Sequence, residues 1–396
     1  MKILHCCLAA FYIDDYSYQE NILPKIHKMM GYDVEILAST ETYLDNKTLG
    51  YTSKGIYTTK DGILLTRIPY IRWIPHALAR KLRLYEQVDA YLESSRPDII
   101  FMHDCQFLSV WSFVAYAKKY KVRILVDCHT DFINSGRNWV SKNILHKLVY
   151  RRCAKTIEPY TAQFYGTLPL RIEFLNQVYG ISKDKIELLP FGADDTVFKW
   201  SNREMLRLQM RVHLNLNEQD KVFITGGKID KRKNIHLLAS TFVDFVEQSG
   251  RNELKLIVFG KPADDLEADI KRLSRHPSVR YVEWIHSEQL HKYFFAADVA
   301  FFPGTHSVLW EEAVGLGVPC IFLRWKGVEH VDLGGNCVFI DHADKASIRN
   351  VLLSIVNDDT RLERMKKVAM EKGPKLFSYI HIARKAIEQS VGISEK

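Results

Sequence analysis

Two segments in the second half of the chain combine small residues with side chains that can bind an anion. The first runs Gly226-Gly227-Lys228-Ile229-Asp230-Lys231-Arg232-Lys233-Asn234, between a strand-like and a helix-like run. Glycine lets the backbone approach a ligand closely, and four cations within six residues favour a polyanion. The segment lacks the Gly-Lys-Ser/Thr ending of a Walker loop and the dinucleotide fingerprint, so it does not favour ATP hydrolysis or NAD binding. A solvated basic turn is the alternative interpretation.

The second segment is the turn Gly304-Thr305-His306-Ser307, which follows a strand-like run and precedes a helix start. Unpaired N–H groups at a helix N-terminus bind phosphate, and small residues leave room for it. We therefore expect a diphosphate at this turn. Glu312 follows about a turn and a half along the expected helix, where its carboxylate can accept hydrogen bonds from sugar hydroxyls. Pairing of Glu312 with a nearby cation is the alternative.

His129 directly follows the strand-like run 122–128 in the first half of the chain. Its imidazole is a candidate for contact with substrate, although a structural hydrogen bond to loop backbone is equally consistent with the sequence. His103 and Asp104, at the preceding strand end, form a weaker candidate of the same kind. The chain contains no Asp-x-Asp triplet, so we expect no metal clamp and no metal site for the expected diphosphate.

Short apolar runs alternate with helix-length amphipathic stretches along the whole chain, which is typical of parallel sheets covered by helices. The expected strands are 2–7, 33–38, 63–68, 98–103, 122–128, 186–190, 222–225, 254–259, 279–284, 299–302 and 319–323. The expected helices of the first half are 18–30, 77–94, 109–120, 141–154 and 170–179. This α/β pattern predicts two Rossmann-like, doubly wound domains facing a cleft. We expect domains at 1–198 and 199–373, and a C-terminal helix at 374–396 that could pack on either.

Composition narrows the class of partner. The chain has 396 residues and a net charge of +8, which indicates an anionic partner such as nucleic acid, a membrane surface or a phosphorylated small molecule. No apolar run reaches the about 20 residues that cross a bilayer, and the first residues resemble a strand rather than a signal peptide, so we expect a cytoplasmic protein. Seven cysteines without Cys-x-x-Cys spacing predict reduced thiols.

Several motifs together resemble a known family. Leu189-Pro190-Phe191-Gly192-Ala193-Asp194 is similar to a linker motif that ends in Asn-Gly-Val-Asp. Gly227-Lys228 with Lys233-Asn234 is similar to a Gly-Arg-x-x-x-x-Lys-Gly donor loop, and the segment from Glu312 to Pro319 is similar to Glu-Ala-Met-Ala-x-Gly-x-Pro. The chain thus resembles retaining glycosyltransferases of family four, which have the GT-B fold and use nucleotide-diphosphate sugars. The resemblance covers most of the chain and is strongest over 188–341.

The resemblance implies a hexosyltransferase that needs no metal or other cofactor and uses a nucleotide sugar, expected to be a uridine one, as co-substrate. Lys228 and Lys233 would neutralise the diphosphate, Glu312 would hold the ribose, and His129 would lie near the donor sugar and the acceptor hydroxyl. Two positions depart from the family. Lysine replaces arginine at 228, and Gly304 stands where the first of two glutamates is expected, so His306 or the turn amides would take over its contact.

The segment 67–83 mixes cations with aromatic and aliphatic side chains, which suits anionic lipid headgroups. The expected membrane patch is Arg67, Arg72, Trp73, Arg80, Lys81 and Arg83. This patch would hold the protein on the inner membrane face while the enzyme extends a glycan or lipid-linked acceptor, as many relatives do. An ordinary amphipathic helix packed on the sheet is the alternative.

Two further functions stay open. A GT-B-fold epimerase or phosphorylase acting on sugar phosphates is the first. A nucleic-acid-binding protein is the second, although the chain lacks a zinc finger or RNA-recognition module, so we expect no nucleic-acid partner.

Overall fold

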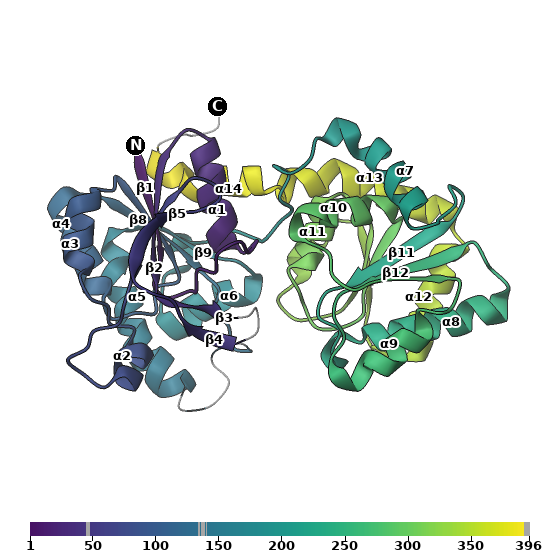
Figure 1. Ribbon diagram of the computed structural model, residues 1–396, viewed down its shortest axis with the longest axis horizontal. Coiled ribbons are helices and arrows are strands. Elements are labelled where there is room, and N and C mark those ends of the chain that lie inside the picture. Colours follow the sequence, from purple (N-terminus) through teal and green to yellow (C-terminus); the bar gives the residue numbers. More distant parts are fainter. Residues whose placement is uncertain (45–47, 134, 136–138, 140, 392–396) are drawn as a thin grey trace. The chain divides into compact units, whose positions relative to one another are not determined.

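The chain folds into two compact α/β units in a computed structural model, which describes residues 1–44, 48–133, 135, 139 and 141–391 (Figure 1). Unit 1 comprises Met1–Pro190 with the residues from Ile382 on, and unit 2 comprises Phe191–His381. The boundary therefore lies at Pro190 rather than near residue 198. The reason is that Ala193 is already tied to unit 2, because its N–H donates to the carbonyl of Phe377 (2.8 Å) and its carbonyl accepts from the N–H of Tyr379 (3.0 Å).

Unit 1 is built on an eight-stranded sheet in the order β10-β9-β8-β7-β1-β2-β6-β5. Every neighbouring pair is parallel except β5 and β6. The strands are β1 (Lys2–Cys7), β2 (Asp33–Ser39), β5 (Gly55–Thr58), β6 (Leu64–Ile68), β7 (Ile99–His103), β8 (Arg123–Cys128), β9 (Thr161–Gly166) and β10 (Ile186–Leu188), and β3 (Glu41–Leu44) pairs with β4 (Thr48–Tyr51) in a separate hairpin. All six strands expected in this half are present.

The helices of unit 1 are α1 (Gln19–Met29), α2 (His76–Leu82), α3 (Val88–Ser95), α4 (Val110–Tyr120), α5 (Arg151–Ile157), α6 (Pro169–Phe174) and, from Ile382 on, α14 (Tyr379–Val391). The single helix expected over 77–94 is two helices, because Arg83 and Gln87 adopt left-handed backbone conformations between them (φ 53° and 59°). Part of the helix expected over 141–154 is a π-helical segment, Ser141–Tyr150, that leads into α5.

Unit 2 contains a fully parallel six-stranded sheet in the order β13-β12-β11-β14-β15-β16. Its strands are β11 (Lys221–Gly226), β12 (Leu254–Phe259), β13 (Val279–Val282), β14 (Val299–Phe302), β15 (Cys320–Leu323) and β16 (Cys337–Ile340). Its helices are α7 (Arg203–His213), α8 (Ile235–Ser249), α9 (Glu267–Leu273), α10 (Ser287–Ala296), α11 (Leu309–Gly315), α12 (Lys345–Val356) and α13 (Asp359–Leu376). This is the Rossmann strand order, whose direction reverses between β11 and β14.

Apolar side chains cover both faces of the unit 2 sheet. Val222 and Ile224 of β11 belong to one buried cluster, whereas Phe223 between them belongs to a second cluster. Such burial on both faces explains why the strands appear in the sequence as continuous apolar runs. All seven cysteines are free thiols, as expected.

The C-terminal region differs from the single helix expected after the Gly-Pro pair. α13 continues through Pro374 and ends at Leu376. The carbonyl of Phe377 and the N–H of Tyr379 then bond to the backbone of Ala193 instead of continuing the helix. α14 then lies beside α1, with the carbonyl of Ala383 2.8 Å from His27 Nε2 (Figure 1). Across the described residues, no helix is both long and apolar enough to span a bilayer.

Candidate active site

The carboxyl ends of β11 and β14 carry the two anion-binding segments expected from the sequence. Because a parallel sheet places these ends at one edge, and because the strand order reverses here, the segments meet at the usual ligand position of a doubly wound sheet. The ammonium group of Lys233 donates hydrogen bonds of 2.7 Å to the carbonyls of both Thr305 and His306. The N–H of Thr305 in turn donates to the carbonyl of Arg232 (3.0 Å). The structure therefore brings Lys233 and the turn 304–307 together.

Local capping fixes the loop that carries Lys233. The carboxylate of Asp230 accepts hydrogen bonds from the N–H groups of Arg232 (3.0 Å) and Lys233 (3.2 Å), which closes a short 3-10 turn. Burial lowers the pKa of Lys233 to about 8, with Asp230 opposing that shift and Arg232 adding to it. An ammonium group that is half desolvated and held by a rigid loop is well suited to bind a phosphate.

The glycines allow these segments to approach each other closely. Gly227 has a φ of +105°, and a Cβ there would lie 3.0 Å from Leu309, the first residue of α11. A Cβ at Gly304 would overlap the backbone of Lys233. The close packing of the two segments thus requires glycine at position 304, where the family has glutamate. Gly226 ends β11, and Lys228 just beyond it is exposed.

The two neighbouring glutamates of α11 have different surroundings. Among the described residues, the carboxylate of Glu312 has no hydrogen-bond or ion-pair partner, which disfavours the cation-pairing alternative. Burial, with a contribution from Asp194, raises the pKa of Glu312 to about 8. A protonated Glu312 can both donate to and accept from sugar hydroxyls.

Glu311, whose role no sequence pattern indicates, is fully buried and paired with two histidines. His306 Nε2 lies 2.8 Å and His330 Nε2 lies 3.0 Å from Glu311 Oε1. Burial would raise the pKa of Glu311, but the two histidines lower it to about 2. The Nε2 atom of His306 therefore faces Glu311. Only Nδ1 of His306 is left to replace the ligand contact of the glutamate that the family has at position 304.

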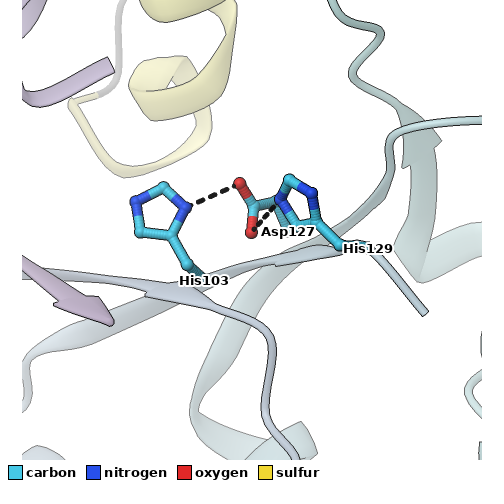
Figure 2. A group of neighbouring side chains, drawn as sticks. All are labelled: His103, Asp127 and His129. Carbon is cyan, nitrogen blue, oxygen red and sulfur yellow. Dashed lines mark hydrogen bonds and ion pairs between the residues drawn. The ribbon is translucent and has the colours of Figure 1, made fainter. Parts of the chain in front are cut away.

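In unit 1, His129 lies beside two other polar residues at the strand ends. Figure 2 shows the carboxylate of Asp127 between the rings of His103 and His129, with His103 Nδ1 2.9 Å from Oδ2 and His129 Nε2 3.3 Å from Oδ1. The register of β7 and β8 places His103 directly opposite Asp127. Burial would lower the pKa of His129, but Asp127 and Glu20 raise it to about 9.

These three residues are the one group of potential metal ligands found among the described residues, with ligand atoms within 4.8 Å of one another. Both ring nitrogens of His103 are already engaged, Nδ1 with Asp127 and Nε2 with His5 (3.1 Å). A metal ion would have to displace one of these contacts. Asp127 and His5 were not recognised from the sequence, because both appear there as residues of apolar strands.

The segment expected to form a membrane patch is only partly at the surface. Arg67 is wrongly placed in that patch, because it is 1% exposed and its guanidinium bonds to Tyr57, Asp14 and the carbonyl of Ser39. Arg83 is half-buried, since it donates to the carbonyl of Gln106 and lies over the ring of Tyr150. Both arginines hold loops of unit 1 together.

The remaining patch residues are at the surface. Trp73 is 80% exposed, Arg72 and Lys81 are exposed, and Arg80 forms an ion pair with the buried Glu41 (2.7 Å). Arg72 also lines a hollow of about 400 Å³ together with Tyr51, Tyr70 and other residues of the same region.

The fold defines a GT-B protein, that is, a chain of two Rossmann-like units, and known structures have the same fold. Sucrose-phosphate synthase from Thermosynechococcus elongatus superposes with a TM-score of 0.64 at 17% identity, over 97% of this chain and 96% of that one. HepE from Anabaena, solved in complex with UDP, superposes with a TM-score of 0.65 at 14% identity, over 99% and 100% of the two chains.

Residues 207–372 match the family model described as glycosyl transferases group 1, so unit 2 carries a domain of that family and the resemblance to family-four glycosyltransferases is confirmed. Mannosylfructose-phosphate synthase of Agrobacterium fabrum is 23% identical over 262 residues, which cover 62% of this chain and 55% of that protein. The matched part thus spans about half the length of this curated relative.

Proposed function

We propose that the chain is a retaining glycosyltransferase that moves a sugar from a nucleotide-diphosphate sugar to a glycan or lipid-linked acceptor. The observation that carries this proposal is the contact of Lys233 with the turn 304–307 at the point where the strand order of unit 2 reverses. The names of the relatives support it, since these are sugar-phosphate synthases and a protein solved with UDP.

Unit 2 would bind the donor. The backbone at Gly226 and Gly227 would pass close to the diphosphate, and Lys233 and Lys228 would neutralise its charge. The N–H of Thr305 is bonded to Arg232, so the turn would add hydrogen bonds through the Thr305 hydroxyl and through the N–H groups of Gly304, His306 and Ser307, and Glu312 would hold the ribose. A uridine nucleotide is the proposed donor base, which the UDP and UDP-glucose complexes of HepE support.

The chemistry requires the bond between the anomeric carbon and the diphosphate to break while the acceptor oxygen forms a new bond to that carbon. Negative charge then develops on the departing phosphate, and positive charge develops on the sugar ring. Cations fixed before the reaction stabilise that transition state without reorganisation, so Lys233 supplies the largest part of the proposed catalysis. The proposed reaction needs no metal, since lysines and amides neutralise the diphosphate. The acceptor would attack on the face that the nucleotide leaves.

His129 is the proposed catalytic residue of unit 1. Its contact with Asp127 orients the ring at the carboxyl end of β8, where ligands of doubly wound sheets bind. The hollow beside Tyr51 and Tyr70 is a second feature of this unit, and its aromatic rings and the guanidinium of Arg72 suit a sugar acceptor that carries an anionic group. The protein would work in the cytoplasm, with the exposed Arg72, Trp73 and Lys81 on the membrane face.

Nucleotide binding is the first test. Thermal-shift screening and calorimetry with a panel of nucleotides and nucleotide sugars should show binding of a diphosphate nucleotide, and Glu312→Ala should weaken it. Absence of binding by every compound would contradict the proposal. Donor consumption without transfer to any acceptor would instead favour the epimerase or phosphorylase alternative.

Transfer is the second test. His129→Ala should lower the rate of transfer while nucleotide binding stays unchanged. Transfer at the parent rate would return His129 to a structural role.

A further inference from the structure

A continuous series of buried polar contacts runs from α14 to His129 within unit 1. The carbonyl of Ala383 lies 2.8 Å from His27 Nε2, His27 Nδ1 lies 3.0 Å from His5 Nε2, and His5 Nδ1 lies 3.1 Å from His103 Nε2. His103 Nδ1 then lies 2.9 Å from Asp127 Oδ2, and the other carboxylate oxygen faces His129. The rings of His5, His27 and His103, like the carboxylate, are 0% exposed. No solvent can therefore satisfy these nitrogens.

The direction of each hydrogen bond follows from the carbonyl at one end. A carbonyl only accepts, so His27 Nε2 carries a proton. A neutral imidazole has one N–H, which makes His27 Nδ1 an acceptor, so the proton in the next contact belongs to His5 Nε2. By the same reasoning His5 Nδ1 accepts and His103 Nε2 donates.

The count of protons then leaves one contact unsatisfied. Three neutral rings supply three protons, whereas the series has four hydrogen bonds as far as Asp127. A neutral His103 that donates through Nε2 would present a lone pair to the carboxylate oxygen at 2.9 Å, which is a repulsive contact between two acceptors. A fourth proton resolves this conflict.

We propose that His5, His27 and His103 form a buried histidine relay that holds one proton more than three neutral rings, and that His103 carries it as a positioning residue for Asp127 and His129. The ionised Asp127 beside His103 is the natural counter-charge. Burial lowers the pKa of His27 to about 4 and holds that of His5 well below its ordinary value, so neither ring keeps the extra proton. Burial would raise the pKa of Asp127, but His103 and His129 hold it well below its ordinary value.

The relay would act on His129 through geometry. With His103 bonded to Oδ2, the carboxylate plane of Asp127 is fixed and Oδ1 faces His129 Nε2. The ion pair with Oδ1 (3.3 Å) then holds the imidazole of His129 from its Nε2 side. Other charges near His129 are the carboxylates of Glu20 and Asp104, and the buried thiol of Cys7 lies near Asp127. The effect on catalysis rests on the proposed function, whereas the proton count does not.

Nitrogen NMR of the full chain labelled with ¹⁵N-histidine tests the count directly. At pH 7 both nitrogens of His103 should resonate in the protonated range, whereas His5 and His27 should each show one protonated nitrogen, at Nε2. Signals are assigned by replacing each histidine singly. An unprotonated nitrogen in His103, or a second protonated nitrogen in His5 or His27, would overturn the relay. This measurement needs no substrate and stands even if no transferase activity is found.

Activity tests the positioning. His103→Phe removes the donor to Asp127, and we expect kcat to fall about 10- to 100-fold with little change in the KM for the donor. His103→Gln restores a side-chain donor and should recover most of kcat. The control is His146→Phe, which removes another buried histidine of unit 1, bonded to the hydroxyl of Tyr179 (2.9 Å), and should leave kcat unchanged. A folded His103→Phe protein with the parent kcat, or equal losses in the Phe and Gln variants, would overturn the positioning role. If His103→Phe does not fold, the kcat of His103→Gln and the protonation of His103 seen by NMR still test the positioning role.

Discussion

The ammonium group of Lys233 lies 2.7 Å from the carbonyl oxygen of His306, across the gap between the loops that follow β11 and β14. The contact with His306 and the equal contact with the carbonyl of Thr305 use two of the three N–H donors of the ammonium group. The third donor is left for a ligand. The charge is thus fixed at the place where a phosphate would bind, before any ligand arrives.

Removal of this charge should impair turnover. We expect Lys233→Ala to lower kcat/KM by about 10- to 1000-fold, the range for loss of one charged group that stabilises a transition state. Lys231→Ala is the matched control, because Lys231 belongs to the same loop but is 75% exposed and pairs with Asp265 (2.8 Å). Steady-state kinetics of both variants check this prediction, and equal rates for Lys233→Ala and the control would contradict the donor site.

Nucleotide binding should also be coupled to proton uptake. The free protein has a Lys233 pKa of about 8, so part of the population is neutral at pH 8.5. A bound diphosphate favours the charged form and raises that pKa, so binding takes up protons at pH 8.5 and takes up few at pH 6.5. Calorimetry in two buffers of different ionisation enthalpy measures this uptake. Because Glu312 titrates in the same range, uptake should persist in Glu312→Gln and disappear in Lys233→Met.

Most strands, and the meeting of Lys233 with the turn 304–307, could be predicted from the sequence because both follow from local pattern and topology. Buried parallel strands such as β12 are uninterrupted apolar runs, and strand order then brings the ends of β11 and β14 together. β9 was missed because Thr161, Gln163 and Gly166 interrupt its apolar pattern. The four-residue strands β3, β4, β5 and β16 were also missed.

The polar networks could not be predicted in the same way. His5 and His103 lie 98 residues apart, and no local pattern indicates that their rings meet. At the start of α11 the sequence shows two adjacent glutamates, and only the phase of the helix decides that Glu311 faces His306 and His330 whereas Glu312 does not.

The unusual pKa of Glu312 predicts a change of stability with pH. The folded value of about 8 lies above that of an unfolded glutamate, near 4.3, so the folded chain binds an extra proton between these pH values. The contribution to stability is complete below about pH 4.3 and is lost as the pH rises through 8. Glu312→Gln stays neutral and should exceed the parent in stability above pH 8 by up to about 5 kcal/mol, because the two pKa values differ by about 3.7 and each pKa unit corresponds to about 1.4 kcal/mol.

Urea unfolding at pH 6 and pH 9 measures this difference. Glu311→Gln is the contrasting variant, because loss of its two histidine partners should destabilise the protein at both pH values. A Glu312→Gln protein less stable than the parent at pH 9 would contradict a pKa of Glu312 raised by burial.

Restoring the glutamate that the family has at position 304 should not restore a family-like site. A side chain at Gly304 would overlap the backbone of Lys233 and separate the two loops. We expect Gly304→Glu to lose nucleotide binding and about 1–3 kcal/mol of stability. Gly55→Ala is the control, because a Cβ there meets no atom within 4 Å. Tight nucleotide binding by Gly304→Glu would show that the loops can separate without loss of the site.

Membrane association should depend on the exposed residues of the segment 67–83 and not on the buried Arg67. Each exposed cation near an anionic surface contributes about 1 kcal/mol, so replacing Arg72 and Lys81 by serine should each weaken vesicle binding by about fivefold, and Trp73→Ser should weaken it further. Arg67→Ala removes the bonds to Asp14 and Ser39, so it should instead lower the melting temperature. The vesicle affinity of the folded Arg67→Ala protein should stay unchanged.

Pelleting with vesicles that contain anionic lipid, at moderate salt, measures the vesicle affinities, and thermal unfolding measures the melting temperature. If the parent protein does not pellet with such vesicles, the segment has no membrane role, and its exposed cations are better explained by the acceptor hollow that Arg72 lines.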